Sequence, residues 1–242
     1  MTKPEAMKAF FEIQAQLQHE GLLEAEQGAV KAALRGDEGE IFFAELSRAD
    51  MTMQEIATGE EQEPFFHAFV VKPEVKALLL LKGTYALQIA SSMRALTAEL
   101  DDMAQIVGLT ARVARTLEPV EMERCLRGRN SCFVKGEGML ITGRSITEAM
   151  TGAILLEKAA MTHLLAKKIG GAKRVPLFSA ALMHFIYQKK YSKINLSAES
   201  VKAEPASQPQ AEAPAQTARE RELRGQIISY GRRLQDEGLL QG

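Results

Sequence analysis

The chain has 242 residues, 46% of them hydrophobic, so it can bury one substantial core but would divide poorly into two. Its 30 basic and 31 acidic side chains nearly cancel. This balance excludes the strong positive field with which proteins bind nucleic acid or an anionic membrane. We therefore expect neither nucleic acid nor a membrane among its partners.

The cysteines and the first residues indicate a reducing compartment. Cys125 and Cys132 lie seven positions apart, without the C-x-x-C spacing of a redox or metal motif and without the density of a secreted disulfide scaffold. Residues 1–14 are charged and amphipathic, and no apolar run reaches membrane-spanning length. We expect two reduced thiols and a soluble, cytoplasmic protein.

Strand-like and helix-like segments alternate after an opening helix that ends near His19. The run Lys-Ala-Leu-Leu-Leu-Leu-Lys at 76–82 is short and apolar enough to be a strand buried on both faces. The Gly136-Glu137-Gly138 segment favours a tight bend between two short strands. Predicted strands cover 40–46, 76–82, 131–135 and 139–142, and predicted helices cover 84–95, 145–169 and 176–191.

The helix over 145–169 has the clearest boundaries. Ser145 and Glu148 have the spacing of a capping box, and Gly170-Gly171 ends the apolar periodicity. Helices interleaved with short strands predict a layered α/β domain with one central sheet.

The C-terminal part has a different composition. Residues 197–218 are rich in Ala, Glu, Pro and Gln and contain no aromatic residue, which predicts a disordered linker. Residues 219–242 return to helix-like spacing of apolar side chains. The sequence thus predicts a domain over 1–196, a linker over 197–218 and an amphipathic helix over 219–242.

A short repeat connects the two ends of the chain. Leu-Gln-His-Glu-Gly-Leu-Leu at 17–23 recurs as Leu-Gln-Asp-Glu-Gly-Leu-Leu at 234–240. The offset is too long for a solenoid repeat and fits a whole domain, so 219–242 resembles the first helix of a second copy. A chance match between two helices that each end at Gly is the alternative. Duplication is favoured because the match includes polar positions that helix formation does not require.

Residues from Met7 to Asn195 resemble a class II aldolase/adducin domain. The resemblance implies a three-layer αβα sandwich around a mixed, largely antiparallel sheet, often assembled as a tetramer with active sites between subunits. The matching segments, in order, are Gly21-Leu22 with Gly28, then Glu63, His67 and Pro73-Glu74, then Leu100 to Gly108, and finally Gly128 to Ala149.

The resemblance also implies where a catalytic zinc would be bound. The family's H-x-H pair falls on Leu80 and Lys82, and its third histidine falls on Glu137. Leucine cannot bind zinc and an ammonium group repels it, whereas a catalytic zinc needs about three protein ligands. We therefore expect no metal and no other cofactor, because the family zinc is lost.

The family's phosphate-binding turns differ as well. The Gly-Thr-Ser/Ala-Gly-Asn turn is replaced by Ala25-Glu26-Gln27-Gly28-Ala29, and the second turn by Phe42-Phe43-Ala44-Glu45. A carboxylate in such a turn repels phosphate. Both anion contacts are expected to be lost.

Glu63, Lys82 and Glu137 remain as candidate catalytic residues. Glu63 matches the family's catalytic carboxylate, and Lys82 is a possible Schiff-base nucleophile with Glu137 as its partner. Simpler interpretations are favoured: a salt bridge between Lys82 and Glu137, and a helix-surface pair between Glu63 and His67. His163 and His184 are expected to be hydrogen-bonded structural residues.

Two functions follow as hypotheses. The first is a degenerate domain without zinc-dependent aldolase activity, which acts as an assembly, regulatory or partner subunit, either as a homo-oligomer or in a complex with a related aldolase-like domain. The alternative is a carbon-carbon lyase that acts on a hydroxy-carbonyl or sugar-derived substrate with a rearranged or metal-free site at Glu63, Lys82 and Glu137.

Overall fold

Strand β4 (Ala77–Leu81) lies at the centre of the fold because its five apolar side chains are all buried. Leu78 and Leu80 point to one face of the sheet, and Ala77, Leu79 and Leu81 point to the other. The computed structural model describes residues 1–24, 28–57 and 63–198. The predicted strand over 76–82 is thereby confirmed as a strand covered on both sides.

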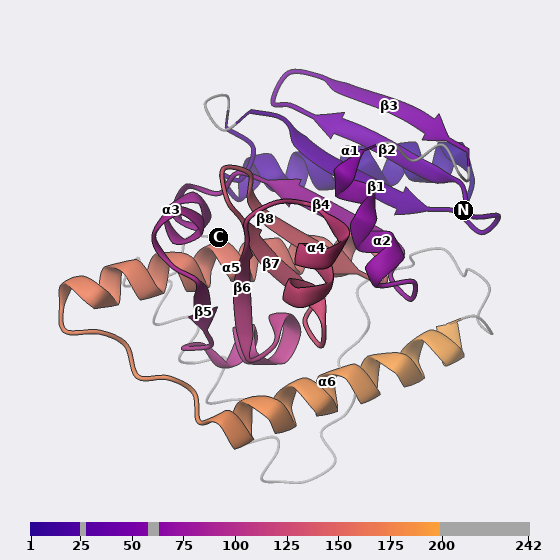
Figure 1. Cartoon of the computed structure of the whole chain (residues 1–242). Helices are drawn as coiled ribbons and strands as arrows, with labels where there is room; N and C mark the ends of the chain where they lie inside the picture. The colour runs from indigo at the N-terminus through magenta and orange to yellow at the C-terminus, as the bar shows by residue number, and fades with distance from the viewer. Residues whose placement is uncertain (25–27, 58–62, 199–242) are drawn as a thin grey trace, which may run out of the picture. The chain divides into compact units, whose positions relative to one another are not determined.

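The described residues form one eight-stranded sheet in the order β3-β2-β1-β4-β8-β7-β6-β5 (Figure 1). All neighbours are antiparallel except β6 and β7, which are parallel. The sheet is therefore mixed and largely antiparallel, as predicted. The remaining strands are β1 (Val30–Arg35), β2 (Ile41–Leu46), β3 (Met51–Ile56), β5 (Ala95–Thr97), β6 (Thr110–Ala114), β7 (Ser131–Val134) and β8 (Gly138–Gly143).

Helices cover both faces of the sheet and complete the three layers. Side chains of α1, α3 and α5 pack on what we call the first face, together with Leu79 and Leu81. Side chains of α2 and α4 pack on the second face, together with Leu78 and Leu80. Figure 1 shows α1 and α5 behind the sheet and α2 and α4 in front of it. The helices are α1 (Lys3–His19), η2 (Pro64–Phe66), α2 (His67–Val71), α3 (Thr84–Ser92), η3 (Met103–Val107), α4 (Pro119–Leu126), α5 (Ile146–Lys168) and α6 (Leu177–Ala198).

Helix α5 begins and ends where the sequence predicts. The hydroxyl of Ser145 accepts a hydrogen bond from the backbone N–H of Glu148 at 3.1 Å, which satisfies one of the unpaired donors of the first turn. Gly171 donates to the carbonyl of Ala166 at 2.8 Å and has a φ of +96°, a conformation that favours glycine.

Other boundaries differ from the predictions. Helix α3 ends at Ser92 rather than at 95, because the chain turns into β5 at Ala95. Helix α6 begins at Leu177 and runs through Ala198, beyond the predicted end at 191 and into the first two residues of the predicted linker. The rest of that linker and the predicted helix over 219–242 lie outside the described residues.

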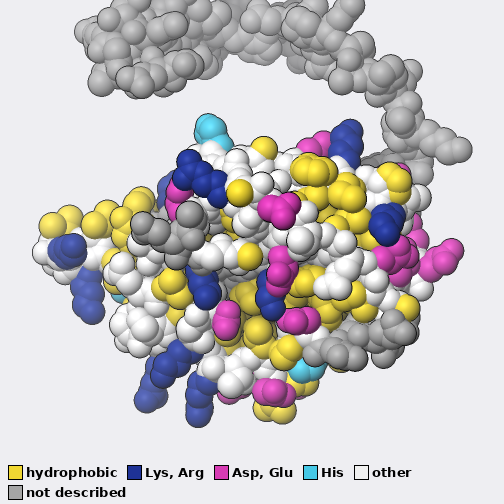
Figure 2. Space-filling view, turned by 90° about the horizontal axis from the view of Figure 1, so that it is seen from above, with side chains coloured by type: hydrophobic (Ala, Val, Ile, Leu, Met, Phe, Trp, Pro, Cys, Tyr) yellow, Lys and Arg dark blue, Asp and Glu magenta, His cyan; other side chains and the backbone are white. Residues whose placement is uncertain are grey.

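Residues Met1–Leu196 form one compact unit. No helix within the described ranges combines the length and the apolar character that crossing a lipid bilayer requires. Acidic and basic side chains are intermixed over the face seen in Figure 2, in keeping with the formal net charge of −1. The surface in that view carries no single-sign field of the kind that attracts a polyanion.

Candidate functional site

The position of the family's first zinc histidine is part of a packed core. Leu80 is 5% exposed and belongs to the cluster of buried side chains on the second face. The same cluster contains Phe43, Phe65 and Phe66, whose ring centroids lie 5.5 to 6.3 Å apart. Tilted and edge-on aromatic contacts of this kind are favourable beyond the area they bury. Apolar packing therefore fills this side of the sheet.

Lys31 on β1 is the cross-strand neighbour of Leu80 on β4. The register of β1 and β4 pairs the two residues, so their side chains share the second face. Lys31 Nζ donates to Oε2 of Glu63 at 2.7 Å, and the two side chains are 33% and 43% exposed. The candidate catalytic carboxylate is thus bound to an ammonium group of the protein itself. We did not anticipate Lys31 from the sequence, although a lysine between apolar residues of a strand is a recognisable signal.

Lys82 and Glu137 approach the same edge of the sheet but do not pair. Lys82 follows β4, and Glu137 lies in the turn between β7 and β8. A Cβ on Gly138 would lie 2.3 Å from the carbonyl oxygen of Leu81, so only glycine fits where this turn meets β4. Among the described residues no ion pair joins Lys82 to Glu137; Lys82 is half-buried and Glu137 is exposed. The predicted salt bridge is therefore wrong.

Glu63 and His67 do not form the predicted helix-surface pair either. Glu63 precedes η2 and turns to Lys31, whereas His67 begins α2 and places Nδ1 2.9 Å from the carbonyl oxygen of Leu117. The physical reason is Pro64, at the first position of a 3-10 turn that separates the two residues. Glu63 and His67, although four positions apart, therefore do not lie on one α-helix.

The other two predicted structural histidines are confirmed as hydrogen-bonded. His163 Nδ1 lies 3.0 Å from a carboxylate oxygen of Glu99, and His184 Nδ1 lies 2.7 Å from the carbonyl oxygen of Gln105. His184 is 8% exposed and fixes α6 to the η3 segment.

A second charged group, which the sequence reasoning missed, lies at the opposite end of β4. Lys72 is 12% exposed, and its Nζ donates to the carbonyl of Arg129 at 2.8 Å and to Oδ1 of Asn130 at 3.1 Å. Glu74 completes its surroundings at 3.6 Å. Burial lowers the pKa of the Lys72 ammonium from its ordinary value.

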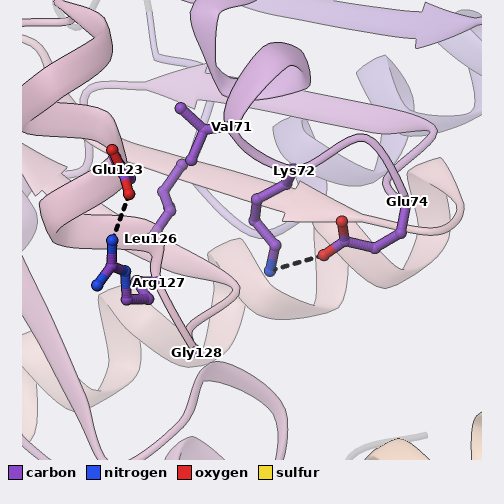
Figure 3. A pocket seen from close by; sticks show the side chains of 7 residues that line it. All are labelled: Val71, Lys72, Glu74, Glu123, Leu126, Arg127 and Gly128. Carbon is purple, nitrogen blue, oxygen red and sulfur yellow. Dashed lines mark hydrogen bonds and ion pairs between the residues drawn. The ribbon is translucent and has the colours of Figure 1, made fainter.

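Lys72 and Glu74 line a cavity of about 390 Å³, together with Arg127 and its ion-pair partner Glu123 (Figure 3). Each of the two cations in this cavity already has a carboxylate beside it. Two hydrogen bonds and one ion pair surround the ammonium group of Lys72. This arrangement fastens the segment after α2 to residues 129–130 and is structural.

The donor groups at the family's metal position do not fit zinc. Leu80 has no lone pair to donate and the ammonium of Lys82 repels a cation, so only the exposed carboxylate of Glu137 could bind one, whereas zinc needs about three protein ligands. The candidate catalytic carboxylate of Glu63 is itself bound to Lys31. Within residues 1–24, 28–57 and 63–198, no group of three His, Cys, Asp or Glu side chains is arranged to hold a metal ion.

Comparisons with known proteins agree with this fold. The family described as "Class II Aldolase and Adducin N-terminal domain" matches residues 23–164. No curated protein sequence is significantly similar to the chain.

Several solved structures share the architecture. An L-fuculose 1-phosphate aldolase superposes with a TM-score of 0.63 at 15% identity, over 78% of this chain and 98% of its own. YgbL from Klebsiella pneumoniae, a putative aldolase/epimerase/decarboxylase, gives a TM-score of 0.57 at 18% identity, over 74% and 98%. The L-fuculose-1-phosphate aldolase of Thermus thermophilus gives 0.55 at 18%, over 69% and 97%. At such identities the likeness establishes the fold alone, and with the family match over residues 23–164 it follows that the chain belongs to the class II aldolase and adducin family.

Proposed function

We propose that this chain is a class II aldolase-like domain that does not carry out zinc-dependent aldol cleavage and acts as a partner or assembly subunit. The observation that carries the proposal is the ion pair between Lys31 and Glu63, 2.7 Å apart and directly across the sheet from Leu80. An ammonium group of the chain is bound to the carboxylate that the family uses for catalysis.

Electrostatics support the loss of metal chemistry. A divalent cation near Glu63 would meet the ammonium of Lys31 within a few ångströms, an unfavourable interaction of several kcal/mol at the effective dielectric of a protein surface, roughly 20. Lys82 adds a second positive charge at the end of β4. Aldol cleavage generates an enediolate that needs an electrophile, and a carboxylate alone cannot provide one.

An apolar stripe on α6 supports a role in assembly. Phe178 is 81% exposed and Ile186 is 54% exposed, and neighbouring apolar side chains on the same helix are also accessible. Contiguous exposed apolar surface of this kind is typical of protein interaction sites. The further members of this stripe are Leu177, Leu182 and Phe185.

The test is the metal content of protein purified without chelators, measured with its mass in solution and its cleavage of sugar phosphates. The expected result is less than stoichiometric metal, no cleavage, and a mass above that of a monomer. An active aldolase of the family, purified and assayed in parallel, is the control. Stoichiometric zinc together with chelator-sensitive cleavage would overturn the proposal.

A second candidate is a carbon-carbon lyase that works without metal at Glu63, Lys82 and Glu137. It is favoured by one observation: among the described residues no carboxylate pairs with the half-buried amine of Lys82. Such an amine can condense with a carbonyl substrate to give an imine and water. Borohydride reduction in the presence of a hydroxy-carbonyl compound would leave a secondary amine at Lys82, detectable by peptide mass spectrometry. An unmodified Lys82 would eliminate this candidate.

A further inference from the structure

Helix α1 attaches to the domain through one face, which we call the docking face. Its members are fully or almost fully buried, between 0% and 3% exposed, and they belong to the core on the first side of the sheet. The helix packs against α5, β2 and β3. The docking face consists of Ala6, Phe10, Ile13 and Leu17.

The end of α1 is fixed as specifically as its face. Gly21 has a φ of +67°, and the backbone N–H of Leu22 donates to the carbonyl of Leu17 at 2.8 Å. This left-handed turn favours glycine and sends Leu22 and Leu23 into the core, where they are 3% and 1% exposed. Gln18 donates from Nε2 to the carbonyl of Arg48 at 2.8 Å, which holds the turn between β2 and β3.

The sequence of residues 219–242, which lie outside the described residues, repeats each of these requirements 217 positions later. The four docking-face positions are all apolar in the repeat, and Gly21 corresponds to Gly238. Gln18 corresponds to Gln235. The apolar equivalents are Leu223, Ile227, Tyr230 and Leu234 for the docking face, and Leu239 and Leu240 for the two buried leucines after the turn.

Ordinary helix formation does not explain this agreement. Any amphipathic helix reproduces an apolar face, but it requires neither the glutamine that holds a neighbouring turn nor two leucines beyond a left-handed glycine. The structure gives each of these a tertiary purpose in α1. The repeat therefore contains the residues that a helix needs to pack into a groove like the one that holds α1, between α5, β2 and β3.

We propose that residues 219–242 form the first helix of a second domain of this same fold, and that this domain is the partner of the chain. The inference rests on the proposed partner function and names the partner. The surface that receives the helix is that domain's counterpart of the groove between α5, β2 and β3. The groove of the present domain already holds α1.

A graft tests the inference in the full chain. Residues 3–23 are replaced by the sequence of 220–240, and unfolding by urea is followed by circular dichroism. The matched control is the same graft with Ile227→Asp and Leu234→Asp, which keeps its length but disrupts the docking face. We expect the graft to unfold cooperatively with the slope of the parent chain, and the control to lose the cooperative transition.

Two docking-face positions of the graft are larger than those they replace, Leu223 at Ala6 and Tyr230 at Ile13. Overpacking of a core is destabilising, so a second graft carries Leu223→Ala and Tyr230→Ile and should raise the midpoint of unfolding. The inference is overturned if both grafts are no more cooperative than the Asp control. Because these grafts measure folding alone, zinc-dependent cleavage by the native chain would refute the proposed function and leave their result unchanged.

Discussion

Nζ of Lys31 lies 2.7 Å from Oε2 of Glu63, and Lys31 faces Leu80 across the β1–β4 register. Glu63 precedes η2, 32 positions further along the chain. The ion pair therefore joins the central sheet to the segment that leads into the second-face helices. Lys31 and Glu63 are brought together by tertiary structure, unlike a surface ion pair between neighbouring residues on one helix.

The Lys31–Glu63 pair should show measurable but modest coupling. In a double-mutant cycle of Lys31→Met and Glu63→Gln, urea unfolding should give a coupling free energy of about 0.5 to 1 kcal/mol, because both side chains are partly exposed to solvent. The coupling should decrease as salt is added. The exposed pair Glu123–Arg127 on α4 is the matched control and should couple more weakly. Zero coupling at low salt would show that the ion pair between Lys31 and Glu63 is not formed in solution.

Leu80 should behave as a core residue rather than as the wall of an open site. Leu80→Ala is expected to lower the free energy of unfolding by about 2 to 5 kcal/mol, because it removes buried methyl groups and leaves a cavity among the aromatic rings. Val120→Ala, at a side chain that is 79% exposed, serves as the control and should change stability by less than about 0.5 kcal/mol. An unchanged free energy of unfolding for Leu80→Ala would mean that the side chain at this position lines an open cavity and is not packed in a core.

Glu157 should make the stability of the chain depend on pH. Its carboxylate accepts hydrogen bonds from the backbone N–H groups of Tyr85 and Ala86 at 2.7 and 2.9 Å, at the start of α3. Burial nevertheless raises the pKa of Glu157 above its ordinary value of 4.5, against the lowering effect of these two bonds. The contribution of Glu157 to stability is thus complete below the unfolded pKa and decreases as pH rises through the folded pKa.

The variant Glu157→Gln isolates this effect because its side chain does not titrate. It should cost about 1 to 3 kcal/mol when the carboxyl group is protonated, since its amide nitrogen cannot accept one of the two backbone hydrogen bonds. The deficit relative to the parent should shrink between about pH 4 and about pH 7. Urea midpoints of both proteins across that range provide the measurement. A deficit that grows with pH would contradict the raised pKa.

Local patterns were sufficient for much of the fold. The apolar run at β4, the glycines between β7 and β8, and the caps of α5 each encode their own boundaries, and the structure has them near the predicted positions. Strand β1 was not predicted individually, because Val-Lys-Ala-Ala-Leu has neither strict alternation nor a long β-branched run.

The candidate site was harder to predict because its contacts are non-local. The partner of Glu63 is 32 positions away, and the acceptors of Lys72 are 57 and 58 positions away. Only the register of β1 against β4 brings Lys31 to Leu80. For Glu63 and His67 the spacing was read as helical, and Pro64 between them determines a different geometry. Pairings of this kind depend on the assembled sheet and not on any local pattern.

The two cysteines should be unreactive in the folded chain. Cys125 on α4 and Cys132 on β7 are free thiols, both 0% exposed within the second-face core. Burial raises the pKa of each thiol above its ordinary value, most strongly for Cys132, and the thiolate is the reactive form. A disulfide-exchange reagent at neutral pH should therefore modify neither residue until urea unfolds the chain, when both should react. Rapid modification of a thiol before unfolding would mean that the core around α4 and β7 opens in solution. The variant Leu80→Ala removes a side chain from the same cluster of buried residues. If the second-face core opens as one unit, both thiols should be modified faster in this variant than in the parent chain.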